Sequence, residues 1–131
     1  MFGALSISGS GAEAMQTWID TSAGNIANMD DQAAVGTPAY GAQTPFLTPV
    51  ATGGEGEGVE VSRVDVGTTK GVVTFQPTST LASAQGYVVV PNVDLADQMV
   101  GMIEAQEGYQ ADTVMMEKAQ SAYAAGLTIG T

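Results

Sequence analysis

PNVDLADQMVGMIEAQEGYQADTVMMEKAQSAYAAGL, residues 91–127, is the longest regular stretch of the chain and has a proline only at its first position. A mostly apolar stripe recurs in it at alternating steps of four and three, which is the spacing of one helix face in a coiled coil. The stripe comprises Leu95, Met99, Met102, Gln106, Tyr109, Thr113, Met116, Gln120, Tyr123 and Leu127. The spacing predicts a helix over 94–127, about 50 Å long, with Asn92 or Asp94 capping its first turn.

A second, shorter helix is predicted over 11–28, about 27 Å long. Ser10 and Glu13 have the spacing of a capping box, in which each side chain satisfies a backbone donor of the other. Asn25 and Asn28 suit the end of this helix because asparagine tolerates the left-handed backbone conformation. The apolar face of the helix is formed by Ala12, Met15, Ile19, Ser22 and Ile26.

The middle of the chain, residues 31–91, holds all five prolines and is predicted to be extended. The alternation of residues 59–66 slips at Ser62 and Arg63, which indicates a β-bulge. With a turn at 67–71 and a return over 72–75, residues 59–76 are predicted to form a β-hairpin. Residues 53–58 are predicted to be a flexible loop, and 86–90 a short strand that ends at Pro91.

Composition excludes most enzymatic and nucleic-acid functions. The chain has 131 residues, 14 acidic against 3 basic, and a net charge of −11. The basic residues Arg63, Lys70 and Lys118 are not neighbours, so no cluster for nucleic-acid phosphates is expected. Cysteine and histidine are absent, which excludes disulfides, Cys/His zinc sites, thiol nucleophiles and imidazole catalysis. No apolar run approaches the roughly 20 residues of a transmembrane helix, and residues 1–11 lack the charge and apolar run of a cleaved signal peptide.

Two weaker patterns were weighed against structural explanations. Residues 9–14, GSGAEA, match a loose dinucleotide-binding motif, but no strand precedes them and the capping box explains the same residues. Glu55 and Glu57, with Asp30 and Asp31, lack the spacing of a calcium loop. We therefore expect no catalytic residue, no cofactor and no metal site.

The two predicted helices do not account for all the apolar residues of the chain. Pairing them buries one face of each, and the longer helix extends beyond the shorter one, so an apolar surface stays uncovered. The residues left off the shared face are Trp18, Val100, Ile103, Val114 and Met115. The methionines of the C-terminal helix fit either an intramolecular core or a contact with non-identical neighbours, because methionine packs against irregular surfaces. The surplus favours a protomer that neighbouring subunits complete.

The predicted fold is mainly α, with N- and C-terminal helices paired as a coiled coil and a small β-hairpin or extended insert between them. The expected divisions are 1–30 for the N-terminal helix, 31–91 for the insert and 92–131 for the C-terminal helix.

Two motifs resemble those of the flagellar rod, hook and hook-associated proteins. Residues 25–28, Asn-Ile-Ala-Asn, are similar to the asparagine signature that all these axial proteins share. The C-terminal block is more specific: Gly86-Tyr87-Val88 and Pro91-Asn92-Val93-Asp94, followed by Met99-Val100 and Tyr109-Gln110-Ala111, resembles the proximal rod subunits of the flagellar basal body. The resemblance covers residues 6–30 and 72–131. A departure is that Gly41 and Ala42 follow Tyr40 where these proteins carry basic residues.

This resemblance implies a structural subunit of the proximal rod, exported by the flagellar type III apparatus without a cleaved signal. Such a subunit assembles helically, with its terminal helices along the axis, and transmits torque from motor to hook. Its partners would be other rod subunits and copies of itself, near the basal-body ring and the export apparatus, with no nucleic acid and no membrane insertion. The expected assembly interface comprises Met15, Trp18, Ile19, Asn25, Ile26, Asn28, Tyr87, Pro91, Asn92, Met99, Met102, Tyr109, Met116 and Tyr123. The alternative is a small secreted helical-hairpin binding module, which would fold alone as a stable monomer or dimer.

Overall fold

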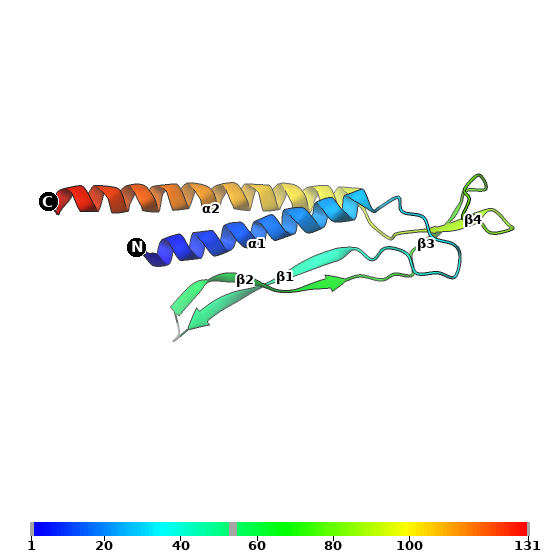
Figure 1. Cartoon of the computed structure of the whole chain (residues 1–131), viewed down its shortest axis with the longest axis horizontal. Coiled ribbons are helices and arrows are strands. Elements are labelled where there is room, and N and C mark those ends of the chain that lie inside the picture. Colours follow the sequence, from blue (N-terminus) through cyan, green and yellow to red (C-terminus); the bar gives the residue numbers. More distant parts are fainter. Residues whose placement is uncertain (1, 53–54, 131) are drawn as a thin grey trace.

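Two long antiparallel helices with two small β-hairpins make up the protein, seen in a computed structural model that describes residues 2–52 and 55–130. The elements are α1 (Phe2–Ala27), β1 (Gln43–Thr52), β2 (Glu55–Val66), β3 (Val72–Phe75), β4 (Tyr87–Val90) and α2 (Leu95–Ile129). Figure 1 shows α1 lying between α2 and the β1–β2 hairpin, with β3 and β4 at the opposite end from the termini. About half of the chain is helical, and the predicted fold class is confirmed.

The first helix begins at Phe2, so the predicted start at residue 11 is wrong. Ser10 is an interior helical residue and does not cap: its Oγ donates a hydrogen bond to the Ile7 carbonyl at 2.8 Å and accepts one from the Val59 amide at 3.0 Å. Contacts with the hairpin therefore use the hydroxyl that the sequence pattern gave to a cap. Residues 9–14 are helical throughout, which also removes the glycine-rich loop that nucleotide binding requires.

Small residues, rather than the predicted stripe, form the face of α2 that packs on α1. A Cβ atom at Gly101 would lie 3.2 Å from the Trp18 Nε1, and one at Gly108 would lie 2.9 Å from the Met15 Sδ. Ala105, between these glycines, is fully buried. The stripe from Leu95 to Leu127 is rotated from this face by about one position. The contact is reciprocal, because the N-terminal half of α1 carries glycines that face α2 side chains: Gly9 faces Met116, and Gly11 faces Asp112.

The pairing of the strands also differs from the prediction of a hairpin over 59–76. β2 pairs antiparallel with β1, and β3 pairs antiparallel with β4. The turn at 67–71 does not reverse the chain onto β2, because the segment before β1 holds it: the Gly67 amide donates to the Ala42 carbonyl at 2.8 Å and the Ala39 amide to the Thr69 carbonyl at 2.7 Å. The predicted bulge is confirmed, since Phe46 pairs with Arg63 and the next residue, Leu47, pairs with Val61.

The remaining predictions for the insert divide between right and wrong. Residues 55–58 belong to β2 and are not a loop, while Gly53 and Gly54 lie outside the described residues. The strand before Pro91 is confirmed as β4, and its Val88 and Val89 are buried. Gly86 precedes β4 with a φ of 85°, and a Cβ there would lie 2.8 Å from the Phe75 ring, so this position requires glycine.

The end of the insert and the start of α2 follow the prediction. Asp94 is the N-cap, and its Oδ1 accepts a hydrogen bond from the Asp97 amide at 3.1 Å. The end of α1 has a different cause from the predicted one, because no non-glycine residue among those described has a positive φ. Asn28 instead donates from its Nδ2 to the Gly24 carbonyl at 2.8 Å, which satisfies a carbonyl of the last turn.

Candidate assembly surface

α2 buries very little of its own surface. Of its 35 residues, only Ala105 is buried. Many of its large apolar side chains are exposed: Leu95, Met99, Val100, Ile103, Tyr109, Val114, Met115, Tyr123, Leu127 and Ile129. The C-terminal turns of α2 extend past the N-terminus of α1 (Figure 1), and from residue 120 to 130 every residue is exposed. An apolar surface of this length is typical of a protein–protein contact.

The total exposed area agrees with this description. The chain exposes 8289 Å², whereas a compact monomer of its mass is expected to expose about 6,500 Å². The difference of roughly 1,800 Å² is comparable to the total area that a specific protein–protein interface buries.

The position of α1 between α2 and the hairpin is fixed by Asn25, which is only 1% exposed. Its Nδ2 donates to the Gln43 carbonyl and to the Gln98 Oε1, both at 2.8 Å. Its Oδ1 accepts from the Tyr40 hydroxyl at 2.9 Å and from the Gln43 amide at 2.7 Å. One side chain therefore joins α1 to the start of β1, to the segment before it and to α2.

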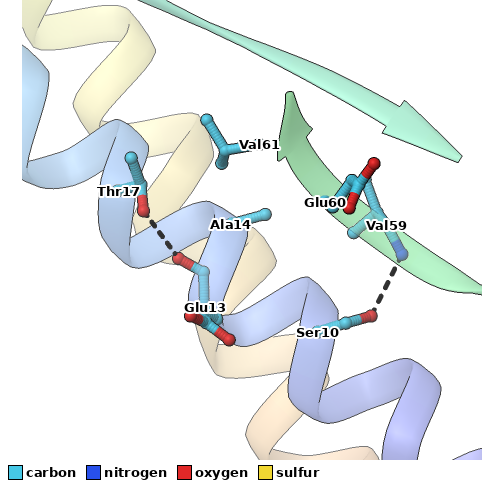
Figure 2. A pocket seen from close by; sticks show the side chains of 7 residues that line it. All are labelled: Ser10, Glu13, Ala14, Thr17, Val59, Glu60 and Val61. Carbon is cyan, nitrogen blue, oxygen red and sulfur yellow. Dashed lines mark hydrogen bonds between the residues drawn. The ribbon is translucent and has the colours of Figure 1, made fainter. Parts of the chain in front are cut away.

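The two helices and the hairpin also enclose two surface hollows. Figure 2 shows the first, lined by α1 residues from Ser10 to Thr17 and by residues 59–61 of β2, with the Ser10–Val59 hydrogen bond at its edge. The second is an open, mainly apolar groove that includes Ile7, Met15 and Leu47, with Asp112 of α2 at its rim. Among the described residues, no three carboxylates come together in a way that would hold a metal ion.

The residues expected at the assembly interface fall into two groups in this fold. Some take part in contacts within the chain: Met15 and Trp18 pack against glycines of α2, Asn25 forms the buried network, and Pro91 is buried. Half-buried positions are Ile19, Ile26, Asn28, Met102 and Met116. The exposed members are Tyr87, Asn92, Met99, Tyr109 and Tyr123.

Of the five residues expected to lie off the shared helix face, four do so. Val100, Ile103, Val114 and Met115 are exposed, but Trp18 packs on Gly101 and belongs to the contact between the helices. The sequence analysis allowed close approach of a backbone at Gly101 and Gly108; side chains occupy that space instead. The partners of Asn25 were missed, because nothing in a linear pattern relates residue 25 to residues 40, 43 and 98.

Comparison with known proteins was decisive for this architecture. The sequence model of the family described as flagellar basal body rod FlgEFG protein C-terminal matches residues 84–129. Proteins named flagellar basal-body rod protein FlgC are similar over nearly the whole chain. The one from Yersinia enterocolitica is 34% identical over 95% of this chain and 93% of its own length. The Salmonella typhimurium protein is 32% identical with the same coverage, and the Bacillus subtilis protein is 26% identical over 98% of this chain and 97% of its own.

The chain belongs to the FlgC family of flagellar basal-body rod proteins. It is a structural subunit of the flagellar basal-body rod, and its family is not enzymatic. FlgC membership implies assembly with other rod subunits. Among the described residues, no helix combines the length and the apolar character needed to cross a membrane.

Proposed function

We propose that this FlgC-family chain is a subunit of the proximal rod, where it assembles helically with other rod subunits and copies of itself and transmits torque from motor to hook. The observation that carries the proposal is the apolar surface of α2, which leaves ten large apolar side chains exposed on a helix with one buried residue. A contact that repeats from subunit to subunit without closing builds a filament.

We propose that residues 1–30 and 92–131 form the part of the subunit along the rod axis, and that residues 31–91 face outward and contact neighbouring subunits. The antiparallel pairing of α1 and α2 supports this division, because it joins the two ends of the chain into one rod-like unit (Figure 1). Export by the flagellar type III apparatus without a cleaved signal is part of the same proposal. The full set of interface residues named from the sequence remains a prediction.

Mass spectrometry of purified basal bodies, stripped of hook and filament, tests the proposal directly. We expect the chain at a few copies per particle. Its absence, together with a stable soluble monomer in the cell, would contradict the proposal and leave the binding module as the better description.

Substitutions on the exposed side of α2 test the interface. Met99→Asp and Tyr109→Asp each place a carboxylate on an exposed apolar position, so we expect incorporation into basal bodies to fall by about tenfold or more while export continues. The matched control is Gln110→Asp, which adds the same charge beside Tyr109 without removing an apolar group. Normal incorporation of the two test variants, or loss of all three from the exported fraction, would contradict the separation of export from assembly.

A further inference from the structure

The side of α2 that points away from α1 carries an apolar stripe of its own. Ile103 lies two residues from both Gly101 and Ala105, and two residues rotate a helix by about 200°. It therefore lies opposite the face that packs on α1. Val100 and Val114 follow the same side at helical spacing, and the three side chains are 55%, 52% and 45% exposed for Val100, Ile103 and Val114. We call Val100, Ile103 and Val114, with the intervening Glu107 and the following Glu117, the outer stripe.

The charges along the outer stripe are strongly one-sided. Glu107 and Glu117 lie on the stripe itself, and Lys118 is the only basic residue of α2. Together the two helices carry seven carboxylates and one ammonium group, because α1 has acidic residues but no basic one. Within the part of the chain that the structure describes, the only ion pair joins Arg63 and Asp65 in β2, so no positive partner for Glu107 or Glu117 comes from the chain itself.

A second copy of the chain is therefore a poor occupant of this stripe. In a rod the copies are related by a repeated helical operation, and packing the stripe on the same helix of a neighbour brings carboxylates toward carboxylates. Like charges facing each other at close quarters are unfavourable and discriminate against that partner. A long helix with an apolar stripe at steps of three and four is suited to another helix, and the flanking charges then select which one.

We propose that the outer stripe of α2 binds a helix of a different, more basic subunit, with Lys or Arg side chains opposite Glu107 and Glu117. The inference rests on the proposed function and names the chemistry of one of its partners. Apolar contacts to Val100, Ile103 and Val114 supply the buried area, and the two carboxylates supply the selectivity.

Photo-crosslinking in intact basal bodies tests the inference with the full chain in its assembly. The probe is p-benzoylphenylalanine, introduced at Ile103 or at Val114, and the products are identified by peptide mass spectrometry. We expect adducts to a chain other than this one, attached in a helical segment with Lys or Arg within one turn. Adducts to another copy of this chain, adducts in an acidic segment, or no adduct at all would overturn the inference.

This experiment separates the inference from the proposed function. Particles that contain the chain but lack the heterologous adduct overturn only the choice of partner. Particles that lack the chain overturn the proposed function and the inference together.

A charge reversal supplies the matched comparison. Glu107→Lys combined with Glu117→Lys is expected to reduce the adduct from Val114 by about tenfold, because the basic partner then faces two ammonium groups. Asp30→Lys combined with Asp31→Lys changes the net charge equally on exposed residues of the turn after α1, and the adduct is expected to stay within about twofold. Equal loss in both variants would overturn the inference. Circular dichroism of the purified double variants checks that helix content is unchanged.

Discussion

Asn25 shows how much of the tertiary structure depends on one amide. All four of its hydrogen bonds have lengths between 2.7 and 2.9 Å, and they reach three separate parts of the chain. Among the described residues, no buried side-chain nitrogen or oxygen lacks a partner. A fully satisfied buried network fixes one arrangement of the elements, whereas a half-satisfied one is costly.

Asn25→Asp is expected to lower the free energy of unfolding by about 2–4 kcal/mol. The side chain keeps its shape, but an acceptor replaces the donor that faces the Gln43 carbonyl and the Gln98 Oε1. The measurement is urea denaturation followed by circular dichroism.

Asn28→Asp is the matched control for that measurement. Asn28 is half-buried and donates one hydrogen bond, to Gly24, so we expect a cost of about 1 kcal/mol or less. Equal costs for the two variants would contradict the role of Asn25 as the junction between the elements.

At the scale of the elements, the contact between α1 and α2 depends on glycines. A glycine in a helix interior costs up to about 1 kcal/mol relative to alanine, and α2 keeps one at Gly101 and one at Gly108. The space they leave is filled by Trp18 and Met15 of α1. The helices therefore accept poorer local propensity in exchange for closer packing.

Gly108→Ala and Gly126→Ala separate these two effects. A Cβ at Gly126 meets nothing within 4 Å, so this variant is expected to gain about 0.5–1 kcal/mol of stability from helix propensity alone. A Cβ at Gly108 would lie 2.9 Å from the Met15 Sδ, and the displaced side chain is expected to remove that gain, leaving Gly108→Ala less stable than Gly126→Ala by about 1 kcal/mol. Thermal unfolding of both variants measures the difference. Equal stabilisation would contradict the packing of Met15 on Gly108.

At the scale of the whole molecule, the chain buries less surface than a stable monomer of its mass and carries a charge of −11. Low burial weakens the hydrophobic contribution to folding, and a large net charge disfavours the compact state. Both effects are relieved when neighbouring subunits cover the exposed face of α2.

The isolated chain is therefore expected to have a free energy of unfolding below roughly 5 kcal/mol, and the value should increase between about 0.05 and 1 M NaCl because salt screens the carboxylates. Urea titration at both salt concentrations is the measurement. A cooperative transition well above that stability, with no dependence on salt, would indicate a self-sufficient monomer.

The sequence by itself determined the two helices, the cap at Asp94, the bulge at Ser62, the strand before Pro91 and the surplus of apolar residues on the C-terminal helix. These features depend on residues within a few positions of one another, where spacing and backbone preference decide the outcome. The resemblance of residues 25–28 and 86–94 to axial proteins was also local, and family membership followed from it.

Only the tertiary structure decided the start of α1, the partners of β2 and β3, and the face of α2 that packs inward. At Ser10 a contact with Val59 replaced the cap, and at 67–71 hydrogen bonds to the segment before β1 replaced a hairpin turn. The apolar stripe of α2 was right as a pattern, but the closest packing went to the glycines, because two helices approach most closely where neither backbone carries a bulky side chain. Contacts between residues distant in the chain overrode the local preference at each of these positions.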